Sequence, residues 1–329
     1  MASKSELVYT VLEVLIGVAC CLGNLLVIWA LWKCGAVRRQ PTFCFIASLA
    51  VADFLVGAVV VPMRILGDGR IHLSFHGCVA FCSVVIVLTQ TSVFSQLAIA
   101  VDRFLRVAIP LRYKTTVTLS RCWWVVTACW LTAATVGFTP LMGWNNRTTM
   151  TQNRTQCQFL NVMSMSYLVY FSFYTLFLVP MLVMTVLYCS IFTLIHRQLR
   201  STISVVSHSY YHKEQKLARS LVLVLVLFAI CWLPIQLMNI ITFYGTKSTI
   251  PRQVFYVGVL VSQINSALNP IIYALKIQRI RDAIKTRFIL CKGEIEVSKS
   301  SQTPGHDHSS NPKRNTCDEL KTIDTIDQD

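Results

Sequence analysis

The sequence predicts an all-α membrane protein in which seven transmembrane helices form one bundle. Of its 329 residues, 54% are hydrophobic and only 14% are charged, which is more apolar surface than one water-soluble core normally uses. The apolar residues gather in seven runs, each close to or above the roughly 20 residues that cross about 30 Å of hydrocarbon. No internal repeat relates the runs, which disfavours transporter folds built from inverted halves.

The first span begins close to the start of the chain, and short loops separate most of the others. In chain order, the predicted spans are Leu7–Trp32, Phe43–Leu66, Cys78–Val101, Trp123–Met142, Tyr167–Leu194, Leu217–Phe243 and Gln253–Leu275. The first run is too long for the apolar core of a cleaved signal peptide, so we expect it to insert uncleaved. Residues 1–6 then form an extracellular N-terminus and residues 7–276 form the bundle.

The chain after the seventh span divides into two parts. Residues 277–291 are basic and amphipathic, which predicts a short eighth helix at the inner membrane surface. Residues 292–329 are polar and contain many Ser and Thr, which predicts a disordered cytoplasmic tail. Cys291 closes the amphipathic part, where a cytoplasmic thiol is either palmitoylated or left unmodified.

Lysine and arginine set the orientation, because positively charged loops remain in the cytoplasm. They are concentrated after the first, third, fifth and seventh spans and are few on the other side. The N-terminus is therefore predicted outside and the C-terminus inside. The net charge of +15 then follows from the topology, and we expect it to face anionic lipid and an intracellular partner rather than nucleic acid.

The outer side carries the candidate covalent modifications. Asn146 and Asn153 each begin an Asn-X-Thr sequon, and glycosylation requires the outer face of the membrane. Most of the 13 cysteines lie in the spans, where a thiol packs as a small hydrophobe. Cys78 starts the third span at its outer end and Cys157 lies in the long outer loop, so a disulfide between them is plausible in the oxidising compartment.

Four polar residues interrupt the spans at depths that are able to bring them together, namely Asn24, Asp53, Asn265 and Asn269. Charged and amide groups in hydrocarbon must face the bundle interior and find partners. The four form either a structural cluster that holds the helices together or a hydrated site for a sodium ion or a proton. We favour the second interpretation, with Asp53 supplying the charge.

The third span ends with Asp102-Arg103-Phe104, which places an acid and a base at the membrane boundary. Arg103 is able to pair with Asp102 or to reach Glu214 at the start of the sixth span. Breaking such a link would let the sixth helix swing outward, which is a bistable element of the kind that regulation needs.

Prolines within the spans favour helices that bend. Pro180, Pro234 and Pro270 each remove one backbone hydrogen bond and allow a kink. Trp232 lies two residues before Pro234, so its indole is either core filler or a sensor of a ligand above it. The adjacent proline favours the sensor.

Taken in order, these residues resemble the landmarks of rhodopsin-like (class A) G-protein-coupled receptors over about residues 7–290. The landmarks are Asn24, Leu49–Asp53, Cys78, Asp102–Phe104, Trp130, Pro180, Tyr188, Cys231–Pro234 and Asn269–Tyr273. The resemblance implies a multi-pass receptor of the plasma membrane. It also implies an activation switch made of Asp102, Arg103, Glu214, Trp232, Pro234, Tyr188 and Tyr273.

Within that family the chain is similar to the adenosine receptors. The similar segments are residues 97–107, 110–114, 139–145 and 265–270, and residues 157–159 and 170–173 look most like the third subtype, then the first. The resemblance implies a receptor for extracellular adenosine that couples to inhibitory G proteins and lowers adenylate cyclase activity. Arrestin and receptor kinases are implied as partners of the tail.

The resemblance also implies the residues of the ligand pocket. Phe159 matches the aromatic ring that stacks on adenine, and Asn239 matches the amide that bonds the edge of adenine, to which an amide offers both a donor and an acceptor. Thr89 and Ser262 match ribose contacts. Apolar walls of the pocket are matched by Ile86, Leu168, Ile235 and Val259.

Two residues at the ribose end depart from the family pattern. Gln263 stands where the family has a histidine, and Arg64 stands where it has a small apolar residue. The family pairs that histidine with a glutamate at the position of Glu13, and here we expect Glu13 to pair with Arg64 while Gln263 completes the network. Either Gln263 is a benign replacement, or Arg64 favours a purine-like ligand that carries a phosphate or carboxylate.

Other function classes are disfavoured. A transporter or channel would need polar residues along a continuous path, whereas these residues cluster at one depth. A membrane enzyme would need paired carboxylates, a histidine-rich metal set or an activated serine, and the seven histidines fall in loops or the tail. We therefore expect a receptor with no cofactor beyond an allosteric sodium ion at Asp53.

Overall fold

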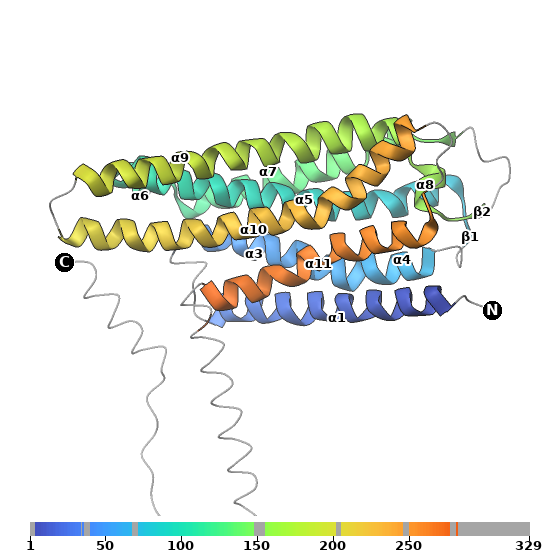
Figure 1. Cartoon of the computed structure of the whole chain (residues 1–329), viewed down its shortest axis with the longest axis horizontal. Coiled ribbons are helices and arrows are strands. Elements are labelled where there is room, and N and C mark those ends of the chain that lie inside the picture. Colours follow the sequence, from blue (N-terminus) through green and yellow to red (C-terminus); the bar gives the residue numbers. More distant parts are fainter. Residues whose placement is uncertain are drawn as a thin grey trace, which may run out of the picture.

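The computed structural model describes residues 4–33, 35, 40–67, 72–147, 155–201, 205–245, 250–276 and 281. Within these ranges, long helices run side by side and form a bundle (Figure 1). They are α1 (Lys4–Lys33), α3 (Thr42–Leu55) continued by η1 (Val56–Val60) and α4 (Val61–Gly67), α5 (Phe75–Ala108), α7 (Leu119–Gly137), η4 (Tyr167–Leu178) continued by α9 (Val179–Ser201), α10 (Val205–Tyr244) and α11 (Arg252–Lys276).

The short elements cap the two ends of the bundle. β1 (His72–Leu73) pairs antiparallel with β2 (Thr155–Gln156), and α8 (Phe159–Val162) follows β2. All three lie at the end where α1 begins, while α6 (Pro110–Thr116) lies toward the opposite end (Figure 1). A 3-10 turn, η2 (Thr139–Met142), follows α7.

Six of the described helical segments are long and apolar enough to cross a membrane. The described helix α7 falls outside this group because Arg121, three tryptophans and several threonines lower the mean hydropathy of its 19 residues. It nevertheless packs against α3 and α5 and turns Trp124 outward, where the indole is 73% exposed. With α7 included, the described helices match the seven predicted spans in number and order.

The third span, α5, lies at the centre of the packing. It contacts α3, α7, α9 and α10, while α1 and α11 close the ring against α3 and α10. The cytoplasmic half of the bundle is filled by one large apolar cluster that includes Leu49, Ile99 and Ile191. Leucines and valines on the outer faces of α1 and α9 remain exposed, as expected for side chains that face lipid.

Two π-helical segments widen the helices near prolines. η1 lies just before Pro62, and the 12 residues of η4 end two residues before Pro180. Such segments often occur at functional sites because they change which side chains face the interior. α4, which continues directly from η1, carries Arg64, and η4 carries Leu168, so both π-helical segments affect the placement of residues of the predicted pocket.

Several helix ends differ from the predicted spans. α5 starts before Cys78 and continues past Val101, and α10 begins at Val205. The prediction that Glu214 starts the sixth helix is wrong, because Glu214 lies well inside α10. α7 ends at Gly137 rather than at Met142, because residues 139–142 tighten into the 3-10 turn that contains Pro140. Asn153, Cys291, the predicted eighth helix apart from Arg281, and the tail lie outside the described residues.

Candidate functional site

A cavity of about 550 Å³ lies among α5, η4, α10 and α11, next to α8. Most of the residues expected in a ligand pocket line it together. They are Phe159, Asn239, Thr89, Ser262, Ile86, Leu168, Ile235, Val259 and Arg64. The volume falls within the range of small-molecule sites, and the mostly apolar wall with a few polar groups is typical of them.

Two of the expected residues, Glu13 and Gln263, lie behind the cavity wall. Both are buried, and the Gln263 side chain donates a hydrogen bond of 3.0 Å to Oε1 of Glu13. Nε of Arg64 lies 3.9 Å from the same oxygen, which is an ion-pair distance and too long for a hydrogen bond. The structure therefore brings Glu13, Arg64 and Gln263 into one network, with only Arg64 facing the cavity.

Several residues of the cavity wall were not predicted from the sequence. Tyr9 of α1 and Tyr256 of α11 both line it and stack on each other with ring centroids 4.0 Å apart. Gln236 also lines it, one helical turn inward from Asn239. The three-residue spacing of Gln236 and Asn239 places both on one face of the helix, so the sequence contained a signal for Gln236 as a pocket residue. It contained none for Tyr9 and Tyr256, because tyrosines near helix ends are common at any membrane interface.

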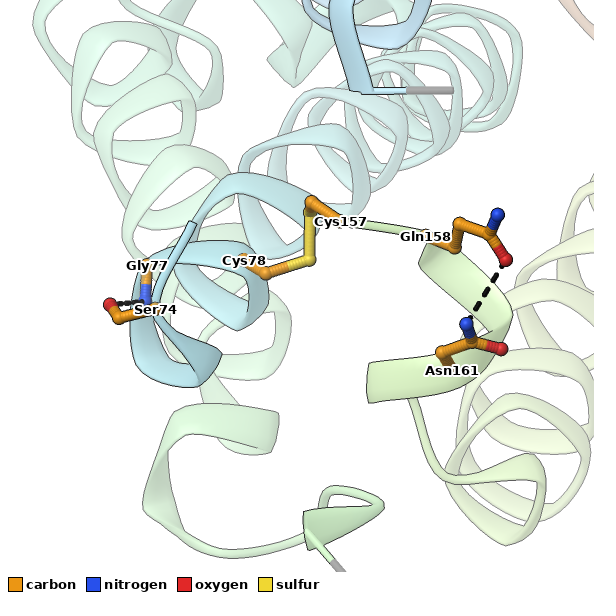
Figure 2. The surroundings of a disulfide bond; sticks show 6 residues. All are labelled: Ser74, Gly77, Cys78, Cys157, Gln158 and Asn161. Carbon is orange, nitrogen blue, oxygen red and sulfur yellow. Dashed lines mark hydrogen bonds between the residues drawn. A yellow bond between two sulfur atoms is a disulfide. The ribbon is translucent and has the colours of Figure 1, made fainter. Parts of the chain in front are cut away.

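A disulfide between Cys78 and Cys157 ties the outer end of α5 to the loop that enters α8 (Figure 2). The hydroxyl of Ser74 accepts a hydrogen bond from the backbone N–H of Gly77 and caps α5. On the other side of the disulfide, the Asn161 amide donates to Gln158 at 3.0 Å. These contacts fix both ends of the short segment that presents Phe159 to the cavity.

The carboxylate of Asp53 lies deeper in the bundle and is fully buried. It accepts hydrogen bonds from Ser92 at 3.0 Å, Ser266 at 2.8 Å and Asn269 at 2.7 Å. We call these four residues the Asp53 cluster. Asn24 donates instead to the backbone carbonyl of Ser266 at 3.0 Å, and thus joins the cluster through α11.

The composition of the Asp53 cluster differs in part from the four residues expected. Among the described residues, Asn24 and Asn265 make no hydrogen bond to Asp53, although both are buried. Ser92 and Ser266 take their places. Serines in helices commonly bond the carbonyl of their own preceding turn, so nothing in their sequence positions distinguished these two.

At the cytoplasmic end, Asp102 is held by hydroxyl groups from two other elements. Thr42 of α3 and Tyr113 of α6 each donate a hydrogen bond of 2.6 Å to its carboxylate. Arg106 donates to both of those hydroxyl oxygens at 3.1 Å and lies over the Tyr113 ring. We call Thr42, Asp102, Arg106 and Tyr113 the inner cluster.

Arg103 forms an ion pair with the inner cluster, in which its Nε lies 3.9 Å from Asp102. The side chain of Glu214 lies outside the described residues, so the alternative partner of Arg103 stays a prediction. Burial, followed by the charge of Asp102, raises the pKa of the Tyr113 phenol. Tyr113 therefore remains a hydrogen-bond donor throughout the physiological pH range.

The predicted switch residues on α10, Trp232 and Pro234, lie at the level of the cavity. Trp232 forms part of the cavity wall and packs near Phe228, which in turn stacks with Phe177. Pro234 lies inside α10, which bends along its length (Figure 1). Tyr188 and Tyr273 are both buried in the apolar cluster of the cytoplasmic half.

Comparison with known proteins agrees with this arrangement. Residues 23–273 match the family described as "7 transmembrane receptor (rhodopsin family)". The chain is 38% identical over 307 residues to adenosine receptor A3 of Canis lupus familiaris, which covers 91% of this chain and 97% of the relative. It is 38% identical to adenosine receptor A3 of Ovis aries over 308 residues, which cover 91% of this chain and 96% of the relative. It is 40% identical to adenosine receptor A3 of Bos taurus over 285 residues, which cover 85% of this chain and 89% of the relative.

The family match spans most of the bundle, and the relatives align over nearly their whole length. The chain therefore belongs to the rhodopsin family of seven-transmembrane receptors and, within it, to the adenosine receptors, and it is a multi-pass receptor of the plasma membrane and not an enzyme.

Proposed function

We propose that this receptor binds extracellular adenosine in the 550 Å³ cavity and couples to inhibitory G proteins, which lowers adenylate cyclase activity. The observation that carries the proposal is the shared cavity wall of Phe159, Asn239, Thr89 and Ser262. These residues supply an aromatic face, an amide and two hydroxyl groups to one cavity. The names of the three relatives support the same ligand.

The chemistry of the wall suits a purine nucleoside. Phe159 offers a face on which a flat heteroaromatic ring stacks, and the Asn239 amide both donates and accepts, as the edge of adenine requires. Thr89 and Ser262 suit the ribose hydroxyls. Trp232 lies in the same wall, so a ligand that binds more tightly when α10 is displaced shifts the receptor toward that arrangement.

The cytoplasmic face is the proposed G-protein site. In the active arrangement, Arg103 leaves its ion pair with Asp102 and contacts the G protein, while basic residues of the inner loops complete the surface. Receptor kinases and arrestin are proposed to act on Ser and Thr of residues 292–329. These steps require the inner cluster to loosen, which links the cavity to the partner.

A dose–response experiment tests the proposal. Cells expressing the receptor are treated with adenosine, and cyclic AMP is measured with and without pertussis toxin. We expect adenosine to lower cyclic AMP and the toxin to abolish the effect. A folded receptor at the cell surface that gives no adenosine response at all would refute the ligand, and a response that raises cyclic AMP would refute the inhibitory coupling.

We also propose that the Asp53 cluster holds an allosteric sodium ion. Asp53 is fully buried, and its hydrogen-bond donors are all neutral. Among the described residues, no cationic side chain forms an ion pair with it. A buried carboxylate needs a compensating charge, and the carboxylate and hydroxyl oxygens present are the ligands that hard cations prefer. When bound, the ion would supply that charge to Asp53, Ser92 and Ser266.

Sodium replacement tests this second proposal. We expect agonist affinity to be several-fold lower in sodium chloride than in an equal concentration of choline chloride, because the ion favours the arrangement in which the cluster is compact. Asp53→Asn should remove the difference, since the amide carries no charge. Radioligand displacement on membranes measures it, and a sodium effect that survives in Asp53→Asn would contradict the assignment.

A further inference from the structure

Arg64 is the one charged side chain among the described residues that line the ligand cavity. The other described residues of that wall are apolar or neutral, and none of them is an aspartate or glutamate. An ordinary nucleoside is uncharged and has no need of a cation. The presence of a guanidinium in this wall therefore calls for a physical explanation.

A purely structural ion pair does not explain the position of Arg64. Its contact with Glu13 is 3.9 Å long, and the Glu13 oxygen already accepts a 3.0 Å hydrogen bond from Gln263. Well-formed arginine–carboxylate pairs make direct hydrogen bonds, often two in parallel. Nη1 of Arg64 is buried and has no hydrogen-bond acceptor among the described residues, so Glu13 does not engage the whole guanidinium. The Arg64 side chain is 28% exposed and lines the cavity, so part of it is accessible to a ligand.

The surroundings locate the Arg64 side chain at one end of the cavity. Gln263, which shares Glu13 with Arg64, follows Ser262 on α11, and Ser262 lines the cavity. The stacked pair Tyr9 and Tyr256 lines the same cavity. In the proposed binding of adenosine, Ser262 contacts the ribose, so the cation is assigned to the ribose end.

We propose that Arg64 forms an anion subsite, and that the cavity accepts purine nucleosides carrying a phosphate on the ribose. This inference rests on the proposed function and specifies its ligand class. Guanidinium groups match phosphate oxygens in geometry and form charge-assisted hydrogen bonds with them. Glu13, which Gln263 hydrogen-bonds, pairs with Arg64 from behind the wall, and the exposed part of the Arg64 side chain faces the phosphate.

Purified receptor in lipid nanodiscs gives the direct test. The probes are adenosine and its three isomeric monophosphates, with the phosphate on the 2′, 3′ or 5′ oxygen, and binding is measured by titration. Adenosine deaminase is added to the monophosphate samples, so that adenosine released by hydrolysis does not contribute. At least one monophosphate should bind the wild-type receptor.

Substitution of Arg64 then separates charge from shape. In Arg64→Gln, the ratio of monophosphate affinity to adenosine affinity should fall about 10- to 100-fold, as expected for a lost charge-assisted hydrogen bond. Arg64→Lys keeps the charge and should retain most of the ratio. Arg64→Gln leaves Glu13 without its cation, so this single variant is at risk of misfolding. The double variant Glu13→Gln/Arg64→Gln has a neutral network and replaces it in that case. The same fall in the affinity ratio is expected in the double variant.

The outcomes separate this inference from the proposed function. If folded wild-type receptor does not bind adenosine, the proposed function fails. If it binds adenosine but none of the monophosphates, or if the affinity ratio is the same in the wild type and the neutral variants, the anion subsite alone is overturned.

Discussion

The carboxylate of Asp102 shows how a single residue is controlled by distant parts of the chain. Its two 2.6 Å hydrogen bonds come from Thr42 and Tyr113, which belong to α3 and α6. By contrast, its neighbour Arg103 approaches only to 3.9 Å. The resting position of Asp102 is therefore set by neutral hydroxyl donors, and the ion pair with Arg103 is the weaker restraint.

Tyr113→Phe tests this balance. Loss of one hydrogen bond to a charged group, about 1.5–3 kcal/mol, should loosen the inner cluster and raise basal G-protein activation about two- to tenfold. Because the pKa of Tyr113 is raised above its ordinary value of about 10, the donor is present below that pH and is lost only above it. Basal nucleotide exchange should thus differ between variant and wild type by the same factor at pH 6.5 and pH 8.5.

Equal basal exchange in the two proteins would contradict the role of Tyr113. Tyr170→Phe is the matched control, because it removes a phenol of the same size at the opposite end of the bundle. It should leave the inner cluster and its basal exchange as they are in the wild type.

Gln96 on α5 offers a stability prediction. The residue is buried, and neither atom of its amide has a hydrogen-bond partner among the described residues. Gln96→Leu replaces the amide with an apolar group of similar size, so it should stabilise the folded receptor by about 1–3 kcal/mol. The apparent Tm of the detergent-solubilised Gln96→Leu receptor should rise by at least about 2 °C. Gln96→Ala also opens a cavity, so its Tm should rise less or fall below that of the wild type. A lower Tm for Gln96→Leu would show that the amide is satisfied.

At the scale of elements, the contact between α1 and η1 depends on glycine. A Cβ atom added at Gly57 would lie 2.6 Å from the Gly17 carbonyl oxygen and 2.8 Å from the Cβ of Cys20. The backbones of the two helices are therefore as close as they are because Gly57 has no side chain. This close packing also positions α4 and hence Arg64.

Gly57→Ala should destabilise the receptor by about 1–3 kcal/mol, the usual cost of overpacking. Gly77→Ala is the control, since its Cβ would meet two side-chain atoms and no backbone, namely the Ser74 hydroxyl oxygen at 3.1 Å and the Leu73 Cβ at 3.8 Å. Thermal denaturation and surface expression of the two variants measure the difference. If both variants behave alike, the approach of α1 to η1 is not limited by Gly57.

The elements also show what the sequence could predict. Hydropathy located the spans because it measures how favourably a segment partitions into hydrocarbon. It does not indicate where a helix ends outside the hydrocarbon. α10 therefore begins at Val205, well before the predicted Leu217, in a polar stretch whose helical state hydropathy does not detect. The π-helical segments η1 and η4 were not predicted, since their side chains are as apolar as those of an ordinary span.

For the candidate site, the resemblance to the adenosine receptors predicted which residues line the cavity. The hydrogen-bond partners of the buried carboxylates could be found only from the three-dimensional structure. Arg64 and Phe159 line one cavity as expected. The donors to Asp53 and Asp102, among them Ser92 and Thr42, are short neutral side chains that occur throughout the spans. Only three-dimensional proximity distinguishes these hydroxyls from the many others.

At the scale of the whole molecule, the two ends of the bundle have different chemistry. β2 and α8, which adjoin the disulfide and the cavity, lie toward the end where α1 begins, and α6, which carries Tyr113 of the inner cluster, lies toward the other end (Figure 1). Asn146 belongs to the loop that precedes β2, on the disulfide side. The position of the loop agrees with the orientation that the distribution of Lys and Arg predicts.

Glycan mapping tests this orientation. Asn146→Gln and Asn153→Gln should each remove one N-linked glycan, because both sequons are predicted to lie outside the cell. Each variant should migrate faster on gels than the wild type, and removal of N-glycans from all samples should make them equal. Wild-type receptor that reaches the cell surface and whose mobility does not change when N-glycans are removed would contradict the topology.

The length of α10 has a mechanical consequence. Its 40 residues extend about 60 Å at 1.5 Å per residue, roughly twice the hydrocarbon thickness. Asn239 lies about 7.5 Å from Pro234 along the axis, while Val205 lies about 44 Å away on the other side. If Pro234 acts as the fulcrum, the helix is a lever with arms in a ratio of about one to six. A displacement of about 1 Å beside a bound ligand then becomes about 6 Å at the cytoplasmic tip.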